Sequence, residues 1–151
     1  MDSDDAEVDF RVRAAVYDGV MTSGTAPLGE DLAAQLALSR EQVAAALERL
    51  AAGRALVLQR DSREVLMANP FSAVPTPFAV RAAGKLYYGN CIWDALGIPA
   101  VLGTDARIDG SCGCCGEAMS LAVTADALEP TDGVVHFAIP ARRWWEDIVF
   151  N

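Results

Sequence analysis

Three prolines close together, Pro70, Pro75 and Pro77, divide this chain into two parts. Proline fixes its own φ, lacks a backbone N–H and disfavours a helical residue before it, so no regular helix can continue through residues 70–77. We interpret that segment as an extended linker. Apolar residues recur at helical spacing before it, and strand-like runs alternate with turns after it. We therefore predict an α+β fold, with a helical domain over residues 1–69 and a small, mostly antiparallel β domain over residues 78–151.

The first domain has the pattern of a winged-helix-like unit with three helices. Residues 28–36 predict a short second helix. Ser39, with Gln42 three residues later, forms a capping box that begins a third helix, and Gly53 ends it. Two apolar runs, residues 55–59 and 64–68, flank a polar turn and predict the wing hairpin. The apolar stripe of the first helix consists of Phe10, Val12, Val16 and Val20.

The second domain alternates strand-like and turn-like pieces. Residues 78–82 and 85–88 predict a hairpin around a glycine turn. A helix beginning at Cys91 is expected to end before Gly97 and Pro99, because both residues weaken helices. The remaining strands are predicted near residues 104–108, 119–124, 134–139 and 147–150.

Cys91 and Asp94 are the candidate catalytic residues. They stand at positions i and i+3 where the helix is expected to begin, so the thiol and the carboxyl would share one helix face. The unpaired N–H groups and dipole of a helix N-terminus favour thiolate over thiol. The pair therefore combines a soft nucleophile with a proton donor. The alternative is a small buried cysteine beside an ordinary first-turn acid.

Three more cysteines, Cys112, Cys114 and Cys115, are separated and flanked by glycines that indicate a tight turn near the surface. Cys112 and Cys115 have the C-x-x-C spacing of half a zinc site or of a redox pair. The chain has one histidine and no second C-x-x-C pair, so a standard zinc site would be incomplete. Four thiols favour a soft metal ion, and a reversible disulfide is the alternative. The candidate metal ligands are Cys91, Cys112, Cys114 and Cys115.

Charge and hydropathy narrow the range of partners. The formal net charge of −9 argues against non-specific binding to nucleic acid or to anionic membranes. No run of about 18 apolar residues is present to span a bilayer, and the acidic N-terminus lacks the basic start of a secretory signal. We therefore expect a cytoplasmic protein whose thiols stay reduced and which has no membrane partner.

Residues 85–88 and 91–103 resemble the core signature of the alkylmercury (organomercurial) lyases, and the similarity continues through Cys112 into residues 119–123. The resemblance implies protonolysis of a carbon–mercury bond. Cys91 matches the family's first catalytic cysteine, whose thiolate attacks mercury, and Asp94 matches the aspartate that relays a proton to carbon. Cys112 matches a cysteine usually regarded as structural. No cofactor is implied. The expected ligands are a small organomercurial, Hg(II) as bound product or another soft metal ion, and small cellular thiols.

The resemblance also implies a second catalytic cysteine near residues 142–147, where this sequence has tryptophans and acidic residues instead. We expect a divergent or C-terminally shortened member in which Cys114 or Cys115 supplies that thiol. Shortening would expose apolar surface near residues 148–150, which a homodimer would cover. Two other functions stay open: a non-catalytic module that binds soft metal or exchanges thiols, and a winged-helix regulator that senses metal or redox state.

Overall fold

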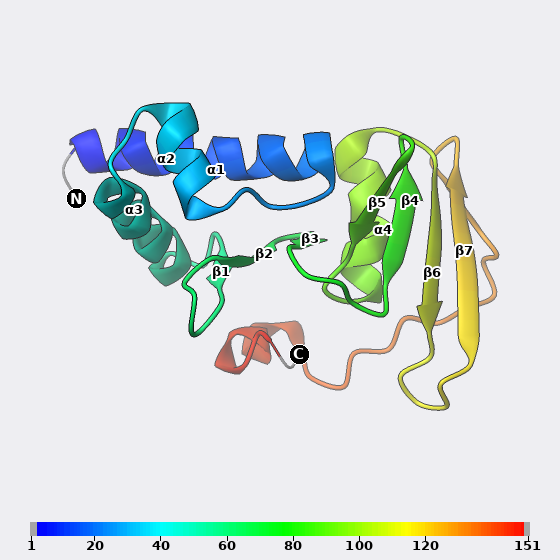
Figure 1. Ribbon diagram of the computed structural model, residues 1–151. Helices are drawn as coiled ribbons and strands as arrows, with labels where there is room; N and C mark the ends of the chain where they lie inside the picture. The colour runs from blue at the N-terminus through cyan, green and yellow to red at the C-terminus, as the bar shows by residue number, and fades with distance from the viewer. Residues whose placement is uncertain (1–2, 150–151) are drawn as a thin grey trace.

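The structure, a computed structural model, describes residues 3–149 (Figure 1). Three helices come first, and a three-stranded antiparallel sheet in the order β1-β2-β3 follows them. A five-stranded antiparallel sheet in the order β5-β4-β6-β7-β8 comes next, with one helix packed against it. The predicted α+β class is confirmed. None of the helices among residues 3–149 is both long and apolar enough to cross a membrane.

The elements of the first part are α1 (Ser3–Ser23), α2 (Gly29–Leu36), α3 (Arg40–Ala52), β1 (Val57–Leu58), β2 (Val65–Ala68) and β3 (Phe71–Ser72). Those of the second part are β4 (Ala79–Ala82), β5 (Lys85–Tyr88), α4 (Ile92–Leu102), β6 (Ala106–Ser111), β7 (Ala118–Thr124), β8 (Ala127–Glu129) and the 3₁₀ helix η1 (Ala141–Glu146).

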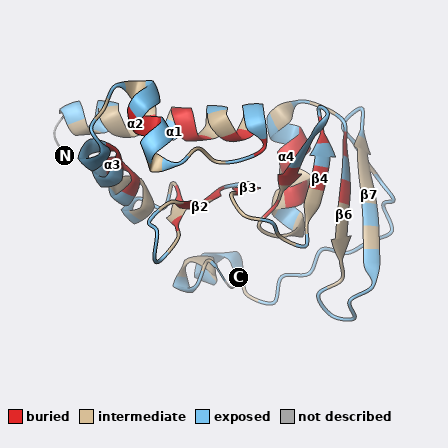
Figure 2. Cartoon of the chain, in the orientation of Figure 1, coloured by how far each residue is buried: buried red, intermediate tan, exposed pale blue. Residues whose placement is uncertain are grey.

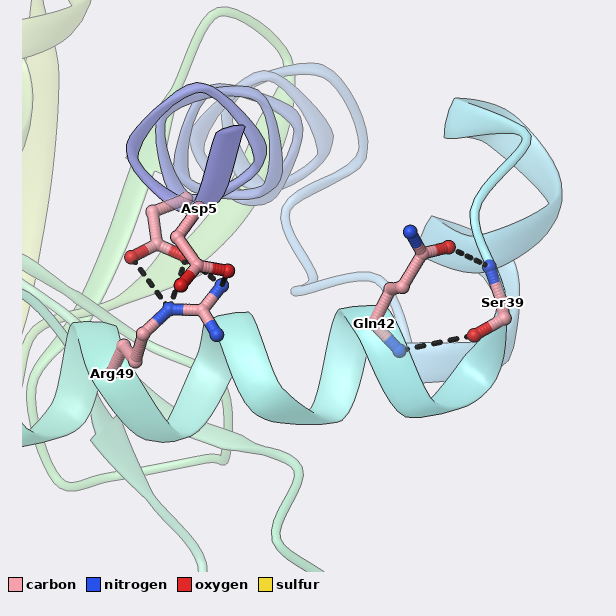
Figure 3. A network of polar contacts seen from close by, with 5 residues as sticks. Asp5, Ser39, Gln42 and Arg49 are labelled. Atoms are coloured by element: carbon pink, nitrogen blue, oxygen red, sulfur yellow. Dashed lines mark hydrogen bonds and ion pairs between the residues drawn. The ribbon is translucent and has the colours of Figure 1, made fainter. Parts of the chain in front are cut away.

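The capping box predicted for α3 is present. The Gln42 backbone N–H donates to Ser39 Oγ at 3.1 Å, and the Ser39 N–H donates to Gln42 Oε1 at 2.9 Å (Figure 3). Farther along α3, Arg49 binds the carboxylate of Asp9 at 2.6 Å and lies 3.5 Å from that of Asp5, which ties the helix to α1. The ion pairs of Arg49 fix how α1 crosses α3.

Two buried clusters form the core. The first lies among the three N-terminal helices and β1–β2, and the second lies between α4 and the larger sheet (Figure 2). Val20 and Tyr17 near the end of α1 reach the second cluster, and the Tyr87 hydroxyl donates to the Met21 carbonyl at 2.8 Å. Phe71, within the proline-rich segment, is fully buried in the same cluster. The helical part therefore packs directly against the β part.

One residue of the predicted stripe on α1 was misassigned. Val12, Val16 and Val20 are buried as expected, but Phe10 is 73% exposed. Phe10 stands two positions before Val12, which puts it nearly on the opposite side of the helix.

The predicted end of α4 was wrong. The helix continues through Gly97 and Pro99 to Leu102, and Gly103 ends it with a left-handed φ of 61°. Proline removes one helical N–H, but Ile98 and Pro99 are buried in the second core, and that apolar packing stabilises the extra turns. Gly97 faces Pro70, with which an added Cβ would be in close contact at 3.4 Å.

Two predicted strands were also wrong. Residues 130–140 form no strand, and Val134 is 90% exposed. Residues 147–149 form a bend and turn after η1, while residue 150 lies outside the described range. The strand that does extend the sheet beyond β7 is β8, which the sequence reasoning missed. Alternating apolar residues predict a strand only where a neighbouring strand is available to pair with it.

Candidate functional site

A sharp turn after β5 brings the chain into α4. Cys91 is the N-cap residue of that helix, with extended backbone angles, and its carbonyl accepts the Ala95 N–H at 2.9 Å. Gly89 is held on both sides, because its N–H donates to the Phe78 carbonyl and its own carbonyl accepts the Thr76 hydroxyl. A Cβ on Gly89 would lie 2.5 Å from the Ala95 backbone nitrogen, so only glycine allows the helix to start this close to the strand.

We expect Gly89→Ala to lower the free energy of unfolding by about 3 kcal/mol, because the new methyl must push α4 away from the chain before it. Chemical denaturation of the variant and the native chain measures the difference. Gly133→Ala is the matched control, because an added Cβ there meets nothing within 4 Å. Equal stability of the two variants would show that α4 does not depend on this close approach.

Cys91 and Asp94 lie close enough together for each side chain to act on the pKa of the other. Burial raises the pKa of the Cys91 thiol, the backbone N–H groups of Asp94 and Trp93 lower it, and the Asp94 carboxylate raises it. The effects that raise the pKa of Cys91 prevail. The start of the helix therefore favours the thiolate, as we expected, but burial and Asp94 outweigh it. Burial also raises the pKa of Asp94 against the hydrogen bonds from Asn90 and Cys91. Both groups therefore retain protons more strongly than in water.

Asn90 is a site residue that sequence reasoning missed. Its Nδ2 donates to Asn69 Oδ1 at 3.0 Å, and its side chain lies close enough to Asp94 to lower the pKa of that carboxyl. Asn90 Oδ1 is buried and has no partner within the described part of the chain. The Asn69 carbonyl accepts the Tyr17 hydroxyl at 3.0 Å, so α1 supports the same network. Asn90 could have been identified from the sequence, because it stands directly before Cys91. Asn69 could not, because it is far away in sequence.

Aromatic side chains join the start of α4 to the C-terminal segment, which runs back across the molecule toward the helical part (Figure 1). Trp93, between Cys91 and Asp94 in sequence, meets Phe137 edge-on with 6.1 Å between ring centroids. Phe137 packs on Trp144 at 5.1 Å, and the Trp144 indole N–H donates to the Ile139 carbonyl. Trp93 remains 58% exposed. Aromatic rings therefore form an apolar surface at the start of α4, the helix on which Cys91 and Asp94 stand.

The remaining cysteines lie in the turn between β6 and β7, as the glycines predicted. The Cys112 N–H donates to the Glu117 carbonyl and the Gly116 N–H donates to the Cys112 carbonyl, both at 2.8 Å. The side chains of Cys112 and Cys115 lie close enough to interact. The backbone N–H groups of Cys115 and Cys114 and the Cys115 thiol lower the pKa of Cys112. Cys114 and Cys115 are exposed.

The four candidate metal ligands are not gathered in one place. Within residues 3–149, no three Cys, His, Asp or Glu side chains lie together in a group suited to hold a metal ion. The structure instead forms two pairs, Cys91 with Asp94 and Cys112 with Cys115.

Comparison with known proteins gives one family. The family model described as MerB, alkylmercury lyase, matches residues 71–150. Curated alkylmercury lyases from Bacillus cereus and Clostridium butyricum are each 27% identical over 124 residues, which cover 80% of this chain and 55% of theirs. The chain thus spans about half the length of those relatives. The crystal structure of the mercury-bound form of MerB2 has the same fold, with a TM-score of 0.63 at 21% identity over 81% of this chain and 58% of that one.

Proposed function

The chain belongs to the alkylmercury lyase family, and on that basis we propose that it cleaves carbon–mercury bonds by protonolysis at Cys91 and Asp94. The observation that carries the proposal is the neighbouring thiol and carboxyl at the start of α4, where burial raises the pKa of each group. A soft thiolate suits mercury, and carbon leaves mercury once it is protonated.

The proposed step needs one proton, which the pair itself holds. Cys91 sulfur attacks the mercury of R–Hg–X while its proton passes to the Asp94 carboxylate, and Asp94 then gives that proton to the carbon. The S–H and C–Hg bonds break, the C–H and S–Hg bonds form, and the products are R–H and Cys91–S–Hg–X. The raised pKa of Asp94 favours its role as proton carrier, and the Asn90 amide orients the carboxyl.

The mercury ion must then leave Cys91. No third Cys, His, Asp or Glu joins Cys91 and Asp94 in a metal-holding group among residues 3–149. We propose that small thiols in solution remove the ion by exchange on mercury, which releases the Cys91 sulfur for another turnover. A reducing cytoplasm supplies such thiols. The organic group R would rest against the apolar surface of Trp93 and Phe137.

DNA binding through α3, the regulator alternative, has less support. Arg40 lies 3.1 Å from the Glu30 carboxylate, and Arg49 is bound to Asp9. These are the cations that such a helix would offer to phosphates, and each already faces an acid.

The test is incubation of the reduced protein with an organomercurial and excess small thiol. Gas chromatography follows the hydrocarbon, and elemental analysis of the desalted protein follows bound mercury. We expect hydrocarbon in excess of protein, at the same rate in a Cys114→Ser control, because Cys114 is an exposed turn residue. Mercury uptake without hydrocarbon would contradict the lyase proposal and favour the non-catalytic soft-metal module.

A further inference from the structure

The turn between β6 and β7 holds a pair of thiols that protonolysis at Cys91 does not use. Two backbone hydrogen bonds close it, from Cys112 N–H to the Glu117 carbonyl and from Gly116 N–H to the Cys112 carbonyl. Gly116 has a left-handed φ of 73°, which lets the chain reverse directly after Cys115. The backbone of this turn therefore holds the Cys112 and Cys115 side chains near each other before any ligand arrives.

We propose that Cys112 and Cys115 form a second binding site for a soft, thiophilic cation, with Hg(II) the best match, separate from Cys91 and Asp94. Both thiols lose a proton on binding, two S–Hg bonds form, and no electron transfer is involved. The site goes beyond the proposed lyase reaction, since it needs neither Cys91 nor turnover.

The number of available metal ligands indicates which ion the turn would bind. Zinc in proteins takes four ligands, and no group of three or more Cys, His, Asp or Glu forms within residues 3–149. Hg(II) binds strongly to two thiolates, so a pair is sufficient. Cys115 is exposed, so the ion can reach the turn from solvent.

The charge around the turn also suits a cation. The Glu117 carboxylate acts electrostatically on Cys112, and the chain carries a net charge of −9. Cys114 lies between the two proposed ligands in sequence, and it acts on Cys112 through its backbone N–H. We therefore expect Cys114 to be dispensable.

The experiment uses the full chain in a Cys91→Ser background, so that no mercury is held at the lyase pair. The reduced protein is titrated with mercuric chloride against a competing monothiol, and bound mercury is measured after desalting. We expect about one ion per chain, with affinity lowered about 100-fold or more when Cys112→Ser and Cys115→Ser are added. Cys114→Ser in the same background is the matched control and should bind like its parent.

Unchanged binding after loss of Cys112 and Cys115 would overturn the proposal. So would mercury-dependent dimers in sedimentation of the Cys91→Ser protein, because they would mean that the ion bridges exposed thiols of two copies. Each serine variant is also tested singly, with its circular dichroism spectrum, so that lost binding is not confused with misfolding. Because the background lacks Cys91, the outcome does not depend on whether the chain is a lyase.

Discussion

Cys91→Ser is expected to lower hydrocarbon release from an organomercurial by at least about 10³-fold, since it removes the nucleophile. Serine is close to cysteine in size and can occupy the N-cap of α4, where Cys91 makes no side-chain capping hydrogen bond. The fold should therefore persist. The serine oxygen, however, is a hard ligand with little affinity for mercury. The proton of the serine hydroxyl is also far harder to remove than that of a thiol.

Single-turnover assays measure this effect, with hydrocarbon quantified against protein concentration. Cys114→Ser tests whether loss of any thiol has the same result, since Cys114 is an exposed residue in the turn between β6 and β7. Comparable release by Cys91→Ser and the native chain would remove Cys91 from the reaction.

Asp94→Asn is expected to lower hydrocarbon release by about 10²–10⁴-fold while leaving mercury uptake at Cys91 nearly unchanged. The amide keeps the shape of the carboxyl and can still accept from Asn90, but it cannot carry the proton to carbon. Parallel assays of hydrocarbon and bound mercury separate the two steps. Asp126→Asn, at an exposed turn residue, is the matched control. Equal loss of binding and release would mean that Asp94 holds the site together and has no special part in proton transfer.

We also expect Asp94→Asn to change how the stability of the fold depends on pH. Burial raises the pKa of Asp94 above its ordinary 3.8, so the folded chain keeps this proton to a higher pH than the unfolded chain does. Between the ordinary and the raised pKa, the stability of the native chain therefore falls as pH rises. We expect Asp94→Asn to be more stable than the native chain at neutral pH, with the advantage lost below pH 3.8. Thermal melts of the variant and the native chain, at neutral pH and below pH 3.8, check the direction of the difference in stability.

Features set by neighbouring residues could be predicted from the sequence. The capping box of Ser39 and Gln42, the hairpin of β4 and β5 and the turn holding Cys112 each depend on a few consecutive residues. The contact of Cys91 with Asp94 follows from helical spacing in the same way. For these elements the local signal and the tertiary structure agree.

Features that depend on distant packing could not be predicted. Helix α4 passes Gly97 and Pro99 because its apolar face is buried against the sheet, which single-residue propensities do not include. Residues 134–139 alternate like a strand but find no pairing partner. Asn69 reaches Asn90 only because the proline-rich segment and the start of α4 lie together in the fold. The sequence therefore predicted the proximity of Cys91 to Asp94, but it did not predict the Asn69 and Asn90 amides beside them.

The central claim is that Cys91 and Asp94 transfer a solvent-derived proton to carbon as mercury moves to sulfur. The most direct measurement is mass spectrometry of the hydrocarbon released by the native chain and by Cys91→Ser in deuterated buffer, with excess small thiol. We expect the native chain to release hydrocarbon that carries a single deuterium, and the variant to release only the trace formed without protein. Equal release by the two proteins, or none by either, would contradict the account.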